Sequence, residues 1–552
     1  MKVYDAIANA FVKEGTDTIF GLLGDGQMPW WDSMAKYPGM KIVDARDEGC
    51  AVTMAEGYYM ATGKIAVASS THGPGLARAT TALIVATRSH TPVVMYTTKV
   101  PQENDSHSQQ LNQAALIAAT GAGYIEVQSP SAAEGAVRQA FYRARLESRP
   151  YVLAVATDVQ NKDCDADGED YVPSTVMFPG QQPIRPAVGA LKAAAGIIAK
   201  SKKPVIVLGR GSKSPEAKAV AEALAKRIGA LVATTLWGKG TLAEDEFHVG
   251  ISGLFSHRDI MGLFAEADCV IAIGAALSLH TMAGGYLYPE AKFVHIDVAP
   301  HVMMGNDRSA DCYVQGEAVA ATQEILDLLS KDGYENKGFR TPDVRKVIKG
   351  ASRDPAEFEI EPGTVDPREA ARLLDEKLPS NVGVVSSANA HACSFRAMLM
   401  LKPRPLNLFL SAFGCIGQAL STGIGAAVGV DHPICCVEGD GGALQAIQEL
   451  DTAARLGIRF LYVVMNDDAY GAEYQKLKAH GKNVNMSVVK TPDFGALGRD
   501  FGCAGRTATT LDEFGAAVDE FVKGSGPMVI DLKISKNVIS IPYRRVHFGQ
   551  DV

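Results

Sequence analysis

The chain has 552 residues, which is enough for about three domains, and its 47% of apolar and 21% of charged residues are ordinary for a globular protein. A net charge of −8 and the lack of a long basic run argue against a nucleic-acid partner. No uninterrupted apolar stretch reaches the length that spans a membrane.

The N-terminus and the cysteines predict where the protein works. Met1 leads directly into an amphipathic pattern, without the long apolar core of a signal peptide. The nine cysteines are scattered, several of them inside apolar runs, and they lack the CxxC or Cys/His spacing of a metal site. We therefore expect free thiols in a reducing, cytoplasmic location.

Three blocks in which strands alternate with helices follow one another along the chain. In the first block, residues 4–14 have helical periodicity and residues 18–21 predict a strand that ends in glycine. Further apolar runs predict strands at residues 65–68, 93–96, 151–155, 204–209, 269–274, 293–297, 382–385, 434–437 and 460–465. This alternation implies mostly parallel sheets.

The predicted fold is α/β, with three doubly wound, mostly parallel-sheet domains at residues 1–170, 185–335 and 360–540. Residues 158–186 are rich in Asp, Gly, Gln and Pro, and residues 331–366 are charged and interrupted by Pro and Gly, so both are interpreted as linkers. The tail after Ile541 is interpreted as a solvated end, with an active-site cover as the alternative.

The segment from residue 439 to residue 467 is the most informative part of the chain. A strand leads to Gly439-Asp440-Gly441, a helical stretch follows at residues 445–456, and a second strand leads to Asp467. Neighbouring parallel strands end at one edge of a sheet, so both acids should face one crevice, where a hard cation and a phosphate group could lie between them. A unit whose acids merely cap a helix and a turn is the alternative.

The spacing of 27 residues between Asp440 and Asp467 resembles the diphosphate-binding motif of thiamine diphosphate enzymes. A second Gly-Asp-Gly, at residues 24–26, lacks the partner acid, because Val52 stands 27 residues after its aspartate. Nearly the whole chain resembles the acetolactate synthase and benzoylformate decarboxylase group of that family, with its pyrimidine-binding, central and diphosphate-binding domains in this order. The resemblance implies Mg²⁺ bound by Asp440, Asp467 and the carbonyl of Ala469.

Two further segments carry the resemblance. Residues 46–58 resemble the segment with the family's catalytic glutamate. The resemblance places Glu48 beside N1′ of the aminopyrimidine. There it would favour the imino tautomer, which takes the proton from C2 of the thiazolium. Residues 413–420 resemble a glycine-rich turn whose bulky aliphatic residue, Ile416 here, wedges between the two cofactor rings. A helix N-terminal acid and a plain glycine turn are the alternatives.

Residues 386–391 align with the family's segment that donates hydrogen bonds to the diphosphate, with Asn389 and His391 as donors. A polar strand-to-helix turn with an Asn cap is the alternative. The cofactor-binding residues that the resemblance implies are Asn389, His391, Gly414, Ile416, Gly439, Asp440, Gly441, Gly442, Asp467, Ala469, Tyr470 and Gly471.

His72 is the sharpest candidate on the substrate side, and we expect it to be catalytic together with Glu48 and Ile416. It follows a strand and precedes a helix, so it should point into the crevice, and a histidine near this place relays protons in decarboxylating relatives. Its alternative role is to fix the glycine turn that follows it. The other substrate candidates are Gln27, Gln110, Asn112 and Gln113, and the sequence leaves open which of the last three faces the substrate.

Two departures from the family narrow the function. Acetohydroxyacid synthases carry a tryptophan shortly after the metal motif, where this chain has Lys476. They also carry an arginine in the run that corresponds to residues 274–280, which has none here. Branched-chain amino-acid synthesis is therefore not favoured, and FAD, although open as a further cofactor, is not supported.

The sequence predicts a thiamine diphosphate- and Mg²⁺-dependent enzyme that cleaves or forms carbon–carbon bonds, a 2-ketoacid decarboxylase or carboligase similar to acetolactate synthase. A lyase or hydrolase of acyloins or diketones, and a flavin-coupled 2-ketoacid oxidase, are the alternatives. Because Glu48, Asp440 and Asp467 are all present, a catalytically silent paralogue is disfavoured. The expected partners are a 2-ketoacid, aldehyde or diketone and, since the family's sites form between subunits, further copies in a homodimer or homotetramer; no nucleic-acid or membrane partner is expected.

Overall fold

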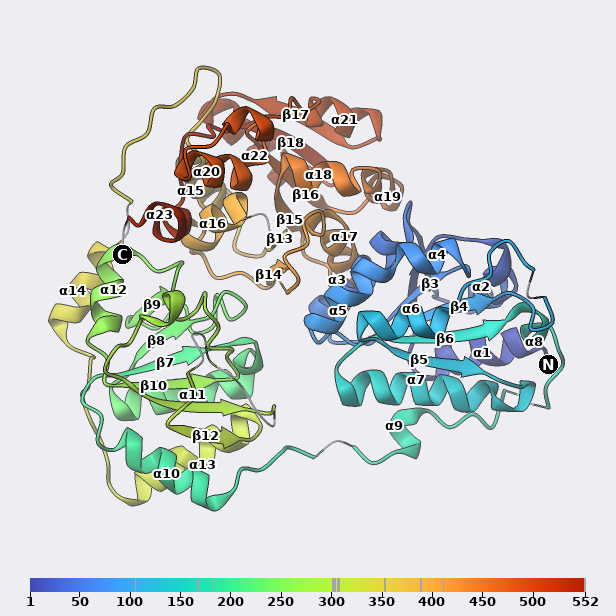
Figure 1. The fold of residues 1–552 in the computed structure, drawn as a ribbon, viewed down its shortest axis with the longest axis horizontal. Helices are drawn as coiled ribbons and strands as arrows, with labels where there is room; N and C mark the ends of the chain where they lie inside the picture. The colour runs from blue at the N-terminus through green and yellow to red at the C-terminus, as the bar shows by residue number, and fades with distance from the viewer. Residues whose placement is uncertain are drawn as a thin grey trace.

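The computed structural model describes residues 1–104, 106–165, 168–180, 182–299, 304, 308–351, 354–387, 390–410 and 412–550. These residues form three α/β domains, coloured blue to cyan, green, and yellow to red in chain order in Figure 1. Each domain is built on one six-stranded sheet, and every pairing between neighbouring strands of the three sheets is parallel. The predicted fold class is therefore confirmed, and the sheets are wholly parallel.

The first sheet has the strand order β2-β1-β3-β4-β6-β5. Its strands are Thr18–Gly21 (β1), Lys41–Asp44 (β2), Ala66–Ser70 (β3), Val93–Lys99 (β4), Gly123–Val127 (β5) and Tyr151–Ala156 (β6). The helices are Val3–Lys13 (α1), Met28–Ala35 (α2), Glu48–Thr62 (α3), Pro74–Arg78 (α4), Thr80–Arg88 (α5), Gln113–Thr120 (α6), Ala133–Glu147 (α7) and Thr157–Gln160 (α8), with Ser174–Met177 (α9) in the connection that follows. Strands β3 and β6 are buried at every position, as expected for a parallel sheet covered on both faces.

The central sheet has the order β12-β11-β10-β7-β8-β9. Its strands are Pro204–Leu208 (β7), Leu231–Thr234 (β8), His248–Ile251 (β9), Cys269–Ile273 (β10), Lys292–Asp297 (β11) and Cys312–Gln315 (β12). The helices are Val188–Ile198 (α10), Pro215–Ile228 (α11), Arg258–Ala265 (α12), Ala318–Lys331 (α13) and Pro342–Gly350 (α14). Helices α9 and α14 lie in stretches that the sequence pattern interprets as linkers, so these connections carry short structure of their own.

The third sheet has the order β14-β13-β15-β16-β18-β17. Its strands are Gly383–Ser387 (β13), Asn407–Leu410 (β14), Ile434–Gly439 (β15), Phe460–Asn466 (β16), Ala504–Ala508 (β17) and Met528–Lys533 (β18). The helices are Pro367–Lys377 (α15), Ala390–Leu399 (α16), Ala419–Gly429 (α17), Asp440–Ala446 (α18), Glu449–Leu456 (α19), Gly471–Ala479 (α20), Phe494–Asp500 (α21), Leu511–Lys523 (α22) and Ile541–Phe548 (α23). The single helix expected at residues 445–456 is thus two helices, α18 and α19.

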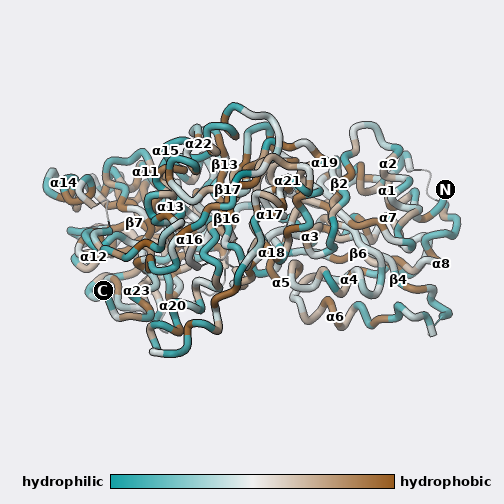
Figure 2. Tube along the Cα trace, turned by 90° about the horizontal axis from the view of Figure 1, so that it is seen from above, coloured by the Kyte–Doolittle hydropathy of each residue, from teal (hydrophilic) through white to brown (hydrophobic). Residues whose placement is uncertain are grey.

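The first and third domains share a hydrophobic core, because α3 packs directly on α17. A Cβ atom at Gly57 would lie 2.0 Å from the carbonyl oxygen of Thr422, and one at Gly425 would lie 1.9 Å from that of Met54. Glycine is therefore the residue that allows the two helix backbones to approach so closely at both positions. Figure 2, seen from above, also places α3, α5 and α17 where the two domains meet.

The C-terminal tail differs from its prediction as a solvated end. Residues 541–545 are buried, and the guanidinium of Arg544 makes an ion pair of 2.7 Å with Asp354. Arg545 donates a hydrogen bond of 2.7 Å to the carbonyl of Leu254 in the central domain. Asp354 and Leu254 lie far from the tail in the sequence, so the sequence pattern did not reveal these partners. In Figure 1, α23 lies between the central and third domains.

Candidate active site

The two acids of the predicted metal motif come together at the carboxyl edge of the third sheet. Asp440 begins α18 directly after β15, and Asp467 directly follows β16, the neighbouring parallel strand. Both are buried, with 3% and 7% of their surface exposed. The sheet order changes direction between β13 and β15, so Asp440 stands at the topological switch point where ligands bind in such sheets.

The contacts of these acids leave room for a cation. Asp440 Oδ1 accepts a hydrogen bond of 2.8 Å from the amide of Gly441, whereas its Oδ2 is buried and has no partner among the described residues. Asp467 Oδ1 accepts a bond of 3.2 Å from the amide of Ala469. A buried carboxylate oxygen without a partner is costly unless a ligand satisfies it.

The pKa shifts of Asp440 and Asp467 also favour a bound cation. Burial, opposed by the Gly441 amide and assisted by the negative charge of Asp468, raises the pKa of Asp440 to about 7. Burial and then the charge of Asp440 raise the pKa of Asp467, while the ammonium of Lys536 opposes this rise. Two adjacent buried carboxylates that repel each other fit a divalent cation with oxygen ligands. The sequence pattern gave no indication of Lys536, because it follows β18, far along the chain.

Glycines keep the surroundings of the acid pair open. A Cβ atom at Gly471 would lie 2.4 Å from Asp467 Oδ2, and one at Gly441 would lie 3.0 Å from the ring of Tyr470. Tyr470 itself is 46% exposed and Ala469 is buried. Gly439 and Gly442 flank Asp440 and Gly441 at the end of β15 and the start of α18. The predicted cofactor residues of this edge therefore fit a metal-bound diphosphate.

A buried acid, Glu438, binds the backbone of the glycine-rich turn that precedes α17. Gly414 and Gly417 have φ of +69° and +81°, and Ile416 between them is half-buried. The amide of Gly417 donates a hydrogen bond of 3.1 Å to Oε1 of Glu438, whose Oε2 accepts one of 2.8 Å from Tyr462. Glu438 was not predicted from the sequence, although an acid at the end of the apolar run of β15 was an available signal.

Two of the predicted diphosphate donors are not tested by the structure. Asn389 lies outside the described residues. His391 lies in the first turn of α16, and its side chain is likewise not described. Their roles stay predictions.

Glu48 is the first residue of α3 and is 8% exposed. The preceding Asp47 caps the helix by accepting from the amides of Gly49 and Cys50. Glu48 Oε2 lies 3.5 Å from Nε of Arg78. Burial, helped by the charge of Asp47 and opposed by Arg78, raises the pKa of Glu48, so this carboxyl group holds a proton more readily than a solvated one, as a proton relay requires.

The start of α3 is attached to the third domain of the same chain. Thr53 donates a hydrogen bond of 3.0 Å to Oε1 of Gln418, which belongs to the glycine-rich turn. The amide of Arg46 donates one of 2.9 Å to Oε1 of Glu449 at the start of α19. Glu48 is thereby held on a rigid helix rather than on a loop.

His72 is buried at the switch point of the first sheet, after β3. Its Nδ1 lies 2.8 Å from Oγ1 of Thr98, and its Nε2 has no partner in the described parts of the chain. The ring of His107 lies edge-on, 5.6 Å away between centroids. Burial lowers the pKa of His72, so its imidazole is neutral at physiological pH and can accept or give up a proton.

The structure separates the glutamine and asparagine candidates around His72. Gln27 and Gln113 are buried, and each uses its amide nitrogen on a backbone carbonyl, that of Leu22 and that of Thr98, both at 2.9 Å. Their Oε1 atoms are buried without partners among the residues described. The same holds for Oε1 of Gln109, which was not among the predicted residues. Gln110 is exposed, and Asn112 is exposed and caps α6 through the amide of Ala115.

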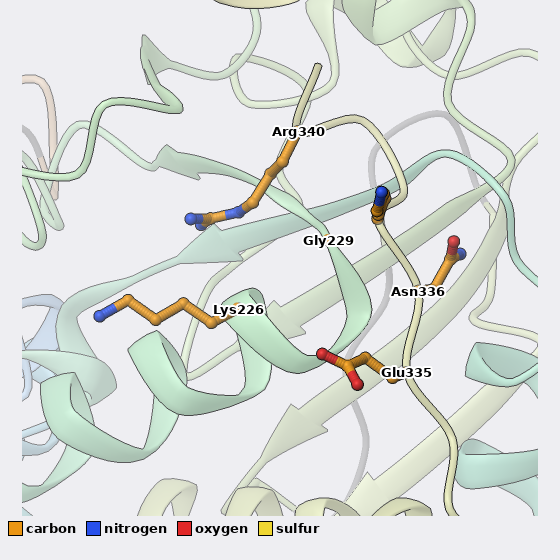
Figure 3. Close-up of a pocket in the computed structure, with 6 residues that line it drawn as sticks. Lys226, Gly229, Glu335, Asn336 and Arg340 are labelled. Atoms are coloured by element: carbon orange, nitrogen blue, oxygen red, sulfur yellow. The ribbon is translucent and has the colours of Figure 1, made fainter. Parts of the chain in front are cut away.

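A surface pocket of about 520 Å³ on the central domain is unrelated to these residues. Figure 3 shows Lys226 at the end of α11, with Glu335, Asn336 and Arg340 on the segment opposite. Arg340 is paired with Asp245 at 2.8 Å and Lys226 is paired with Glu222, so the pocket's charges are largely satisfied within the chain.

Comparison with known families agrees with the geometry. Residues 1–116 match "Thiamine pyrophosphate enzyme, N-terminal TPP binding domain", residues 191–325 match the central domain of the same enzymes, and residues 391–532 match their C-terminal TPP binding domain. The chain belongs to the thiamine pyrophosphate enzymes, thiamine pyrophosphate being another name for thiamine diphosphate. The resemblance found in the sequence is thereby confirmed.

The relatives place the chain in the acetolactate synthase-like group. A probable acetolactate synthase large subunit of Methanocaldococcus jannaschii is 27% identical over 97% of this chain and 92% of its own length. The acetolactate synthase large subunit of Haemophilus influenzae is 24% identical over 97% and 94%. A sulfoacetaldehyde acetyltransferase of Castellaniella defragrans is 26% identical over 98% and 94%. None of the described helices is both long and apolar enough to cross a membrane.

Proposed function

We propose that the protein is a thiamine diphosphate- and Mg²⁺-dependent 2-ketoacid decarboxylase or carboligase. The observation that supports this most is the buried group around His72, where His72 Nε2, Gln27 Oε1 and Gln113 Oε1 all lack partners in the described structure. Polar atoms of this kind need hydrogen bonds, and the carbonyl, hydroxyl and carboxylate groups of a 2-ketoacid and its products offer them.

The residues of the third domain would hold the cofactor. Asp440, Asp467 and the carbonyl of Ala469 would bind Mg²⁺, and Ile416 would pack against the cofactor from the glycine-rich turn. When bound, thiamine diphosphate supplies a carbon nucleophile and a sink for the electrons released at the substrate carbon. Glu48 would exchange a proton with the cofactor at its buried carboxyl, and His72 would exchange one with the substrate through Nε2.

We further infer that two copies complete each site, as a homodimer or a dimer of dimers. Helix α8 follows β6 at the sheet edge that carries His72, and in Figures 1 and 2 it lies on the side of the first domain away from α18 and α20. Exposed apolar side chains near both edges, Leu23 and Met28 in the first domain and Met486 in the third, suit a covered surface. The first domain of one copy would then face the third domain of another.

Product analysis tests the reaction. The purified protein with Mg²⁺ and thiamine diphosphate is incubated with 2-ketoacids, aldehydes, acyloins, diketones and sulfoacetaldehyde, the last because one relative is named for it. Release of CO₂ with an aldehyde or a hydroxyketone supports the proposal. Cleavage of acyloins or diketones without CO₂ would favour a lyase or hydrolase, and flavin absorbance with oxygen uptake would favour an oxidase.

A further inference from the structure

A small cavity between the central and third domains is surrounded by positive charge. Its volume is about 10 Å³, and its lining residues are Lys239, Val384, Arg396, Met400, Arg404 and Asn407. Lys239 comes from the turn after β8 of the central domain, and the others come from β13, α16, β14 and the segment between α16 and β14. Three of these six side chains are cationic and none is acidic, and the volume suits one water-sized particle.

Arg396 is the most buried of these cations, with 1% of its surface exposed. Its guanidinium donates to Ser386 Oγ at 2.5 Å, to the Leu408 carbonyl at 2.6 Å and to the Val384 carbonyl at 2.7 Å. All of these acceptors are neutral, as is the Asn407 side chain that completes the set. The described chain therefore offers this charge hydrogen bonds but no counter-charge.

Two partly buried lysines from the central domain add to the charge. The ammonium group of Lys239 makes no hydrogen bond or ion pair with any described residue, and burial and then the charge of Arg396 lower its pKa to about 8. Lys213, after β7, places Nζ 3.4 Å from the carbonyl oxygen of Asn407, and burial lowers its pKa to about 8 as well. Both ammonium groups would be more stable beside an anion.

Among the described residues, Asp375 of the third domain is the carboxylate that pairs with these charges. Arg404 pairs with Asp375 at 2.6 Å, and its Nε is buried without an acceptor in the described structure. His248 accepts a hydrogen bond from the amide of Gly250 at Nδ1, so its Nε2 carries the proton of the neutral ring, and that buried Nε2 also has no described acceptor. Burial, and then the charge of Lys239, lower the pKa of His248 to about 4.

Donors thus outnumber acceptors in a region where buried charge is costly unless it is paired. We propose that the cavity binds one inorganic anion of chloride size, with Lys239 Nζ and Arg404 Nε as its donors and Lys213 and Arg396 supplying further positive charge. Because the donors belong to two domains, the anion ties the central domain to the third domain. A volume of about 10 Å³ favours a single-atom anion over a phosphate or carboxylate group. None of the residues that line the cavity is among those proposed to hold the cofactor, and the anion site does not depend on which reaction the enzyme catalyses.

Bromide tests the site directly, because it replaces chloride and scatters anomalously. Crystals of the whole protein with cofactor and Mg²⁺ are grown in sodium bromide and in sodium gluconate. We expect an anomalous peak within hydrogen-bonding distance of Lys239 Nζ and Arg404 Nε in bromide. Electron density of a water, with no anomalous signal, would overturn the proposal.

Thermal unfolding supplies the second readout. At equal ionic strength, the wild-type Tm should be a few degrees higher in chloride or bromide than in gluconate, because a ligand of the folded state stabilises it. Lys239→Met should lose that shift and should be at least as stable as wild type in gluconate, since it removes an unpaired charge. Lys226→Met, a surface lysine of the same domain paired with Glu222, is the matched control and should keep the shift. An equal halide shift in Lys239→Met and wild type would show a general salt effect and contradict the site. If Lys239→Met does not fold, Lys213→Met and the bromide crystals test the same claim.

Discussion

Oγ1 of Thr98 lies 2.8 Å from Nδ1 of His72 and fixes the orientation of the imidazole at the edge of the first sheet. This contact engages one ring nitrogen and leaves the buried Nε2 as the nitrogen that can meet a substrate. Thr98 is a β4 residue and His72 follows β3, so two neighbouring strands position the group. A histidine held in this way is a better proton relay than one that rotates freely.

Thr98→Val should lower kcat about 10-fold, which corresponds to about 1.4 kcal/mol, with a smaller effect on KM. Valine keeps the shape of threonine but cannot bond to Nδ1, so the imidazole loses its fixed orientation. Steady-state kinetics over a range of pH would show both the loss and a displaced profile for the histidine. Thr80→Val is the control, because among the described residues the Thr80 hydroxyl bonds only to the Ala77 carbonyl within its own turn. Unchanged kinetics in Thr98→Val would show that His72 does not depend on this contact.

Asp440→Asn should weaken Mg²⁺-dependent binding of thiamine diphosphate by more than about 100-fold, since even residues that only support metal ligands cost 10–100-fold. The same substitution should raise the Tm of the protein without metal at neutral or higher pH, because it removes the repulsion between Asp440 and Asp467. Titration calorimetry and thermal unfolding measure these opposite effects.

Asp25→Asn is the matched control for Asp440→Asn, because Asp25 occupies the same place in the other Gly-Asp-Gly of the chain. It should leave cofactor affinity unchanged. Equal losses in both variants, or none in either, would contradict the assignment of the metal to the third domain.

Glu56 provides a test of pH dependence. It is 1% exposed in α3, accepts a hydrogen bond of 3.2 Å from Thr91, and has its pKa raised by burial from 4.5 to about 7. Between pH 4.5 and about 7 the folded state binds this proton and the unfolded state does not. The free energy of unfolding therefore falls as the pH rises through this range, by about 3 kcal/mol in total.

Glu56→Gln should therefore have a higher Tm than wild type at about pH 8, and the difference should shrink as pH falls through 7 towards 4.5. Thermal unfolding across this range measures it. Glu103→Gln, at an exposed position, should show no such trend. A difference that grows with falling pH would show that Glu56 is charged in the folded protein.

Mixing two inactive variants tests whether each site spans two chains. A hybrid dimer contains one Glu48→Gln chain and one Asp440→Asn chain. If each site takes Glu48 from one chain and Asp440 from the other, one of the hybrid's two sites keeps both residues. At random reassociation half of the dimers are hybrids, so the mixture should recover up to about a quarter of wild-type activity. A site contained in one chain would never be intact in the hybrid. No recovery, despite proof of hybrid formation by tagged purification, would contradict the shared site.

Much of the fold was predictable because the strands are long apolar runs that end in glycine or an acid, as at β15 and β16. The alternation of such runs with helices gave the parallel sheets and brought Asp440 and Asp467 to one edge. The break between α18 and α19 was not predictable, because residues 443–456 contain no glycine or proline that would mark it. The burial of α23 depends on Asp354 and on the Leu254 carbonyl, partners too distant in sequence for periodicity to reveal.

The candidate site was predicted in part. The resemblance named Glu48, His72 and both aspartates. The sequence could not separate Gln113 from Gln110, because the burial of Gln113 depends on its contact with the Thr98 carbonyl, 15 residues earlier in the chain. Glu438 and Lys536 were missed because their roles arise from contacts with Gly417 and Asp467 across the fold.

The central claim is that Glu48 drives proton loss from thiamine diphosphate, and exchange of the cofactor's C2 proton for deuterium measures this directly. Glu48→Gln keeps the shape of the side chain, so it should bind thiamine diphosphate and Mg²⁺ with nearly wild-type affinity. Exchange in this variant should be slower by about 100-fold or more, the scale of acid–base catalysis. Exchange at the wild-type rate, with the cofactor bound, would contradict the account.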